Sequence, residues 1–337
     1  MTVAWGLLST ARINLRVLEA AAECDRAEVV AVASRGAERA EAYAREHGIP
    51  RAYGSYEALL EDADVEVVYI SLPNALHVPW TLRALEAGKH VLCEKPFSRE
   101  PEQVERAFEL AESKRLVLSE GFMWRHHPQT KTLSKLAADG AVGPLRLVRD
   151  AFSFQAAATH GAGDTRFDPE LDGGSLMDVG SYCVNAIRLL AGEPERVQGE
   201  QVLGESGVDV CFAGTLRCPG DVVAHFDCGF VFPYRAALEV VGEEGSLVVG
   251  DPWHAGSPGI ELRRQGEPQA ETVAIEPANS YRLELDDLCA AIRGEAAPLL
   301  GRDDALGQAR TIDALYRSAA GAGPVELPTP SSDGSAS

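Results

Sequence analysis

The amino-acid sequence predicts an α/β protein in two parts: a doubly wound parallel sheet of the Rossmann type, then an α+β part with an open, mostly antiparallel sheet. In the first part, short apolar segments at residues 3–8, 28–33, 65–71, 91–93 and 116–119 alternate with stretches of helical apolar spacing, as in a parallel sheet. Beyond about residue 143 strand patterns dominate, interrupted by one helix at residues 175–190. The length of 337 residues, 45% of them hydrophobic, suffices for two cores.

The individual elements follow from the same patterns. Helices are expected in the first part at residues 15–22, 37–46, 56–60, 77–88 and 101–114. Strands are expected in the second part at residues 144–153, 196–203, 208–216, 222–230, 236–241, 246–249 and 260–264. Two further helices, at residues 281–293 and 303–318, precede a tail rich in Pro, Ser and Gly. We therefore predict domains at residues 1–121 and 122–325 and a flexible tail at residues 326–337.

The charge balance and the cysteines exclude several classes of protein. Lys and Arg number 31 against 51 Asp and Glu, and the resulting formal charge of −20 repels nucleic acid and anionic membranes. The seven cysteines are an odd number without a CxxC pair, which indicates a reducing compartment and argues against structural zinc. Without an apolar run of about 18 residues or a secretory signal pattern, we expect a cytoplasmic protein with no bound metal.

The turn after the first strand is the expected place for a dinucleotide. A GxGxxG fingerprint would stand here, but the residues are Ser9, Thr10, Ala11, Arg12, Ile13 and Asn14, so every glycine position is substituted. Small side chains still allow a pyrophosphate to approach the backbone, and the following helix offers free N–H groups and the positive end of its dipole. The alternative is a βα turn that binds nothing.

The end of the second strand indicates which dinucleotide is bound. An NAD-binding protein places a carboxylate here for the ribose 2′-hydroxyl, but this chain has Ser34 and Arg35. A hydroxyl followed by a guanidinium suits a 2′-phosphate, because Arg binds phosphate through a bidentate fork. We therefore predict NADP as the cofactor in preference to NAD. The alternative is that Arg35 caps a solvent-exposed turn.

A charged pair follows the strand at residues 91–93. Glu94 and Lys95 stand at the strand's carboxyl end, where open α/β sheets bind their ligands. Pro96 restricts Lys95 to an extended or turn conformation and could follow it through a cis bond. Lys95 is therefore a candidate for chemistry, although Glu94 and Lys95 could instead be a solvated pair.

The helix at residues 175–190 carries a second set of candidates. Asp178 and Tyr182 are four residues apart, so they share one helix face, after a Gly173-Gly174 pair expected to be flexible. A tyrosine has a pKa of about 10 and needs a nearby positive charge to act as a base near neutrality. A lysine about 4 Å away contributes roughly 4 kcal/mol at an effective dielectric of about 20. Lys95 is the candidate for that charge.

Taken together, these residues resemble the glucose-fructose oxidoreductase, inositol dehydrogenase and rhizopine catabolism (Gfo/Idh/MocA) oxidoreductases. The matching segments cover nearly the whole chain: residues 9–13, Pro73-Asn74 with His77, Glu94-Lys95-Pro96, residues 122–128 (FMWRHHP), and Gly173-Gly174 with Asp178, Gly180 and Tyr182. Tyr182 makes the chain most similar to the branch with dihydrodiol dehydrogenase, NADP-dependent xylose dehydrogenase and glucose-fructose oxidoreductase. The glycine-poor first turn departs from the family pattern, as does Thr165, where many members carry an aromatic residue.

The resemblance implies hydride transfer between the nicotinamide C4 and a carbinol carbon. Tyr182 would be the general acid/base, Lys95 its electrostatic partner, and Asp178 would orient substrate hydroxyls. The cofactor-binding residues would be Ser9, Thr10, Ala11, Arg12, Ile13, Ser34, Arg35, Leu72, Pro73, Asn74, His77, Glu94, Lys95 and Arg166. The substrate-contacting residues would be Trp124, Arg125, His126, Asp178 and Tyr182.

Some readings stay open at this point. Trp124 could be a packing residue, His126 and His127 could stand at a helix N-terminus without a catalytic part, and residues 156–172 could cover the site or form a non-catalytic insert. The substrate expected is an aldose such as D-xylose or D-glucose, or a keto sugar in the reverse direction. The alternatives are a trans-dihydrodiol or dicarbonyl oxidoreductase, a nucleotide-sugar ketoreductase, and a non-catalytic NADP-binding regulator.

The second sheet is expected to mediate self-association. One face should pack on helices, and the other, lined by Val222, Ala224 and Phe226, should be free to pair with another subunit. We therefore expect a homodimer or homotetramer that associates through this sheet.

Overall fold

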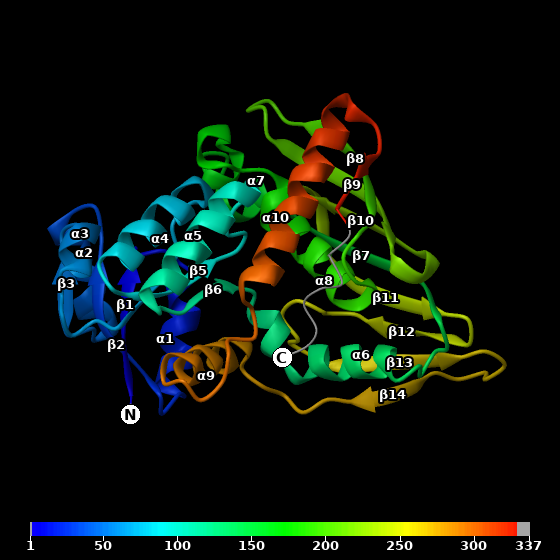
Figure 1. The fold of residues 1–337 in the computed structure, drawn as a ribbon, viewed down its shortest axis with the longest axis horizontal. Coiled ribbons are helices and arrows are strands. Elements are labelled where there is room, and N and C mark those ends of the chain that lie inside the picture. Colours follow the sequence, from blue (N-terminus) through cyan, green and yellow to red (C-terminus); the bar gives the residue numbers. More distant parts are fainter. Residues whose placement is uncertain (1, 329–337) are drawn as a thin grey trace. The chain divides into compact units, whose positions relative to one another are not determined.

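The computed structural model describes residues 2–328, and its α/β chain divides into two compact units. Within the described residues, the first unit contains residues 2–127 and 278–306, and the second contains residues 128–277 and 307–328. Each unit has its own sheet (Figure 1). This confirms the predicted fold class, a parallel Rossmann sheet followed by an α+β part.

Six parallel strands in the order β3-β2-β1-β4-β5-β6 form the sheet of the first unit. They are β1 (Val3–Leu8), β2 (Ala27–Ala33), β3 (Arg51–Tyr53), β4 (Val67–Ile70), β5 (His90–Glu94) and β6 (Leu118–Gly121). The helices are α1 (Asn14–Ala22), α2 (Ala37–His47), α3 (Tyr56–Leu60), α4 (His77–Glu86), α5 (Pro101–Lys114) and α9 (Ser280–Ile292). The strand order reverses between β1 and β4, which is where open α/β sheets form their ligand crevice.

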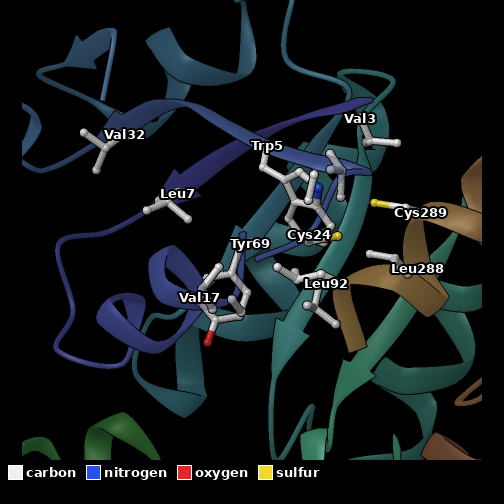
Figure 2. Packing of buried hydrophobic residues seen from close by; sticks show 14 of the residues in the cluster. Val3, Trp5, Leu7, Val17, Cys24, Val32, Tyr69, Leu92, Leu288 and Cys289 are labelled. Atoms are coloured by element: carbon white, nitrogen blue, oxygen red, sulfur yellow. The ribbon is translucent and has the colours of Figure 1, made fainter. Parts of the chain in front are cut away.

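Helix α9 completes the core of the first unit from a distant part of the sequence. It lies beside α1 (Figure 1), and Figure 2 shows Leu288 and Cys289 together with Trp5, Cys24 and Leu92. All five side chains are 5% exposed or less. The compact units thus differ from the predicted domain limits, because residues 278–306 pack with the first sheet to cover an apolar face that would otherwise meet water. The predicted limit between two sequence domains at residues 121 and 122 stays a prediction.

The second unit contains a mixed sheet of nine strands in the order β14-β13-β12-β11-β7-β10-β9-β8-β15. The pair β7 and β10 is parallel, and the other pairs are antiparallel. The strands are β7 (Leu145–Gln155), β8 (Arg196–Leu203), β9 (Asp209–Cys218), β10 (Val222–Gly229), β11 (Val231–Gly242), β12 (Gly245–Val249), β13 (Gly259–Arg264), β14 (Glu271–Ala274) and β15 (Val325–Glu326). Strand β15 lies across the predicted limit between the second domain and the tail, and residues 329–337 of that tail lie outside the described residues.

The helical elements of the second unit include four that the sequence patterns did not predict: α6 (Pro128–Ala138), α7 (Ala156–His160) and the short turns η3 (Thr165–Phe167) and η4 (Pro169–Leu171). The predicted helix at residues 175–190 is a π-helical turn, η5 (Leu176–Gly180), continued by α8 (Ser181–Ala191). Helix α10 (Arg302–Arg317) begins in the first unit and ends in the second.

The prediction of which sheet face is free was wrong. Val222, Ala224 and Phe226 of β10 are 5% exposed or less, because η5 and α8 pack on the face they occupy. The opposite face carries Val223, which is 37% exposed, and His225, which is also exposed. Strand alternation separates the two faces, but it does not say which one the helices cover.

No helix in residues 2–328 has both the length and the apolar character needed to cross a membrane.

A buried carboxyl on α9 makes the stability of the first unit depend on pH. Glu284 is 3% exposed, and burial, reinforced by the charges of Glu94 and Asp287, raises its pKa well above the usual range. The folded chain therefore keeps the proton while the unfolded chain loses it above about pH 4.3. The contribution of Glu284 to stability is present at low pH and is lost as the pH rises toward the folded-state pKa.

We expect Glu284→Gln, which cannot ionise, to gain stability over the wild type as the pH rises from 5 to 8. The gap in unfolding free energy should grow by up to about 1.4 kcal/mol per pH unit. Urea unfolding monitored by circular dichroism at several pH values measures it. The exposed residue Glu61 offers the control variant Glu61→Gln, and parallel pH curves for the wild type and Glu284→Gln would contradict the prediction.

Candidate functional site

The turn after β1 is held by polar side chains in place of glycines. The Oγ atoms of Ser9 and Ser71 lie 2.7 Å apart, Ser71 donates to Asn14 Oδ1 at 2.6 Å, and Asn14 Nδ2 donates to the Ser9 carbonyl at 2.8 Å. The Ala11 N–H donates to Ser9 Oγ at 3.0 Å. This network joins the loops after β1 and β4, the two sides of the strand-order reversal. A glycine-free turn can thus keep a fixed shape at the start of α1, where the N–H groups of Asn14, Leu15 and Arg16 donate to the carbonyls of residues 11–13.

Two arginines stand near the end of β2. The residues that follow the strand are Ser34, which is 5% exposed, and Arg35, which is exposed, and α2 begins at Ala37. Burial raises the pKa of the nearby Tyr56 phenol, while the charges of Arg35 and Arg39 act to lower it. Both guanidinium groups therefore lie close to the same phenol. Sequence reasoning missed Arg39, and its signal was a second arginine in the first turn of the helix that follows Ser34 and Arg35.

His77, at the start of α4, connects the loops that follow β4 and β5. Its Nε2 lies 2.8 Å from the carbonyl of Leu72, and its Nδ1 lies 2.8 Å from the carbonyl of Pro96. The imidazole is 1% exposed, and burial, with a smaller contribution from the charge of Lys95, lowers its pKa to about 4 although both carbonyls act to raise it. A neutral imidazole carries one N–H, so His77 donates to one of these two carbonyls and packs against the other. Of the predicted neighbours, Leu72 is buried and Pro73 and Asn74 are half-buried.

The Lys95–Pro96 peptide bond is cis, and Lys95 is half-buried. One carboxylate oxygen of Glu94 accepts a hydrogen bond from the Tyr69 hydroxyl, and the other accepts from the Lys95 N–H at 3.3 Å. Glu94 therefore belongs to the internal structure of this loop, and the solvated-pair alternative does not describe it.

The predicted substrate residues Trp124, Arg125 and His126 lie in a 3₁₀ turn, η2 (Met123–His126), that contacts α9. Trp124 is 1% exposed and His126 is 3% exposed, and Arg125 Nη1 lies 3.1 Å from Asp304 Oδ1. Within the first unit this turn packs in the core, which favours the packing alternative for Trp124.

Asp178 and Tyr182 are carried by the π turn η5 and the first turn of α8. Arg166 Nε donates to Asp178 Oδ2 at 2.6 Å, and Arg166 Nη1 lies 3.0 Å from Asp164 Oδ1. The charge of Asp178, more than that of Asp164, raises the pKa of the Arg166 guanidinium. The structure thus places Arg166 against Asp178 in the second unit, where it fixes one oxygen of that carboxylate.

Two aromatic rings pack against Tyr182, which is 9% exposed. Phe152 packs edge-on with ring centroids 5.5 Å apart, and Trp253 packs at 5.6 Å with a tilt of 51°. Phe152 and Trp253 stack on each other at 5.8 Å. Sequence reasoning missed both rings. Phe152 comes from β7 and Trp253 from a loop about 100 residues after Phe152, and neither has a local spacing with Tyr182.

The Gly173-Gly174 pair serves close packing and not the predicted flexibility. A Cβ on Gly173 would collide with the Arg166 carbonyl, and one on Gly174, whose φ is +121°, would overlap the carboxylate of Asp209. Gly174 also donates its N–H to the Arg166 carbonyl at 3.0 Å. These contacts connect residues 156–172 to the start of η5, so the end of that segment is fixed against the helix.

Lys95 belongs to the first unit and Tyr182 to the second. Their predicted meeting stays a prediction, as do the individual roles assigned to the site residues.

Comparison with known proteins agrees with this arrangement of elements. Residues 7–122 match the model described as "Oxidoreductase family, NAD-binding Rossmann fold", and residues 130–248 match the GFO/IDH/MocA C-terminal domain. D-xylose 1-dehydrogenase (NADP(+)) 2 of Haloferax volcanii is 37% identical over 96% of this chain and 99% of its own length.

Two solved structures are similar over most of their length. A 3-ketoreductase from Actinomadura kijaniata, in complex with NADP and TDP-benzene, has a TM-score of 0.88 and 30% identity, covering 94% of this chain and 98% of its own. An aldose-aldose oxidoreductase from Caulobacter crescentus complexed with glycerol has a TM-score of 0.88 and 30% identity, covering 97% and 100%. The chain therefore belongs to the Gfo/Idh/MocA family of oxidoreductases.

Proposed function

We propose that this protein is an NADP-dependent dehydrogenase or reductase that interconverts a carbinol and a carbonyl carbon of a neutral sugar such as D-xylose or D-glucose. The observation that carries the proposal is the setting of Tyr182, a nearly buried phenol that packs against two aromatic rings and lies one helical turn from Asp178. In a member of this oxidoreductase family, that arrangement suits a proton donor and acceptor in a site that excludes water.

The hydrogen-bond donors at the end of β2 in the first unit suit NADP. Ser34, Arg35 and Arg39 offer a hydroxyl and two guanidinium groups at the end of β2, where a carboxylate for NAD is lacking in the sequence Ser34-Arg35-Gly36. The turn at residues 9–13 and the start of α1 would receive the pyrophosphate, with Arg12 adding a positive charge. When bound, NADP supplies the hydride acceptor of the reaction. The relative from Haloferax volcanii carries NADP(+) in its name, which supports the preference.

Tyr182 would move the proton, and Lys95 would stabilise the phenolate. A lysine ammonium about 4 Å from a phenolate contributes roughly 4 kcal/mol at an effective dielectric of about 20, and desolvation subtracts from that gain. Asp178, which accepts a hydrogen bond from Arg166, would orient substrate hydroxyls. The proposal requires these groups of the two units to meet at the reacting carbon.

The charge around Asp178 favours a neutral substrate over a nucleotide sugar. One guanidinium, Arg166, faces two carboxylates, Asp164 and Asp178, so this group carries a net negative charge. A diphosphate would be repelled, whereas sugar hydroxyls bind well to carboxylates. Phe152 and Trp253 are 6% and 0% exposed, so these rings pack against Tyr182 and do not distinguish a sugar from an arene. A trans-dihydrodiol oxidoreductase therefore stays the second candidate.

The absorbance of NADPH tests the proposed function. The purified protein should produce NADPH with NADP and D-xylose or D-glucose, and much less with a sugar phosphate or a TDP-sugar. Turnover of a trans-dihydrodiol without sugar turnover would favour the second candidate. NADP binding with no turnover across a wide panel would overturn the enzymatic proposal in favour of a regulator.

Lys95→Met and Tyr182→Phe should each lower kcat by about 10²–10⁴, because general acid/base catalysis is worth about that factor. The fold should stay intact, as circular dichroism would verify. Tyr234→Phe removes an exposed phenol of the same unit and is the matched control. A wild-type rate in Tyr182→Phe would mean that another group transfers the proton.

Arg35→Ala and Arg39→Ala should each weaken NADP binding by about 10- to 100-fold, since a hydrogen bond to a charged group is worth about 1.5–3 kcal/mol. NAD binding should change little in both variants, as measured by fluorescence titration. Arg45→Ala, in the last turn of the same helix, controls for loss of positive charge. Equal losses for NADP and NAD would contradict a phosphate role.

Self-association through the open face of the second sheet is also proposed, with the exposed apolar residues Val223, Val202 and Val231 at the interface. Val202 is 58% exposed and Val231 is 56% exposed, values that are high for β-branched apolar side chains. Light scattering after size exclusion should give a dimer or tetramer at micromolar concentration. A monomer alone would remove this part of the proposal.

A further inference from the structure

Asp209 is a buried carboxylate outside the set of predicted site residues. It is the first residue of β9 and is 2% exposed. Its Oδ2 accepts hydrogen bonds from Ser175 Oγ at 2.7 Å and from the Leu176 N–H at 2.8 Å, and its Oδ1 accepts from Tyr316 Oη at 2.8 Å. One carboxylate thus joins β9, the start of η5 and α10.

The turn that Asp209 binds is the turn that carries the candidate chemistry. Leu176 is the first residue of η5, which contains Asp178 and continues directly into α8 with Tyr182. The residue that precedes η5, Ser175, makes no capping hydrogen bond of its own. A helix start that is buried without a cap leaves N–H groups unsatisfied, so Asp209 supplies the cap from another strand.

Close packing restricts the position of η5 on the sheet. Gly174 lies against the Asp209 carboxylate with no room for a Cβ, and a Cβ on Gly180 would lie 2.7 Å from Cys228 Sγ of β10. The π turn is therefore pressed onto the sheet at both of its ends. A π turn holds one residue more per hydrogen bond than an α turn, so its register decides how Asp178 and Tyr182 are directed.

We infer that Asp209 is a positioning residue for the reaction: by binding the start of η5 it sets the place of Tyr182 and Asp178 relative to the substrate. This inference rests on the proposed function. A displacement of about 1 Å in a catalytic group can lower turnover by about 10²-fold without any loss of the group itself.

The test compares Asp209→Ala, Asp209→Asn and Tyr316→Phe for kcat, KM and the dissociation constant of NADP, with the sugar that the wild type turns over. Asp209→Ala should lower kcat by about 100-fold while NADP binding, a property of the first unit, stays within about twofold. Asp209→Asn keeps an acceptor for Leu176 and should recover most of that loss. Tyr316→Phe should lower kcat by about tenfold.

The matched control is Ser318→Ala. Ser318 Oγ accepts a hydrogen bond from the Gly199 N–H at 3.0 Å, so the variant removes a buried hydrogen bond between the same C-terminal segment and the sheet without touching η5. It should lower the melting temperature and leave kcat unchanged. Folded Asp209→Ala with wild-type kcat would overturn the inference, and if that variant does not fold, wild-type kcat in Tyr316→Phe would do so.

Tyr182→Phe is measured alongside these variants. If Tyr182→Phe turns over at the wild-type rate, the proposed function fails and the inference fails with it. If Tyr182→Phe is inactive while the Asp209 and Tyr316 variants keep the wild-type kcat, the inference fails alone.

Discussion

The reversal of strand order between β1 and β4 is the constraint on which the first unit depends. It leaves the carboxyl ends of two neighbouring strands without a crossing connection above them, so polar loops gather there. Side chains then fix these loops: Ser9, Ser71 and Asn14 join the loops after β1 and β4, and His77 joins those after β4 and β5. Three consecutive strand ends are thereby held as one surface.

The buried acidic side chains differ in the groups that surround them. Burial raises the pKa of Asp209, although the three hydrogen bonds that it accepts act to lower the pKa and offset part of the cost of burying a carboxylate. Glu284 and Asp150 are buried beside other acids, and burial raises both of their pKa values well above the usual range. The hydrogen bonds of Asp209 hold a backbone turn in place, whereas the raised pKa values of Glu284 and Asp150 favour protonated carboxyl groups inside the fold.

Glycine has a different function here from the one that the fingerprint of a dinucleotide fold suggests. The turn after β1 has no glycine and is held by hydroxyl and amide groups, whereas Gly174 and Gly180 in the second unit are required for close approach. Shape at the cofactor turn thus comes from hydrogen bonds, and shape at the Tyr182 helix comes from contact. Both solutions give a fixed backbone, which is what a site that orients a substrate needs.

The sequence by itself determined the elements and the residues at the strand ends. Helix α5 and strand β8 have the predicted bounds, and Ser34, Arg35 and Lys95 follow their strands as expected, because periodicity and turn residues are local signals. Only the tertiary structure decided that α9 joins the first core, which face of the second sheet is covered, and that Phe152, Trp253 and Asp209 adjoin the elements carrying Asp178 and Tyr182. These features depend on partners many residues apart, and an amphipathic pattern shows that an element has an apolar face without showing what will cover it.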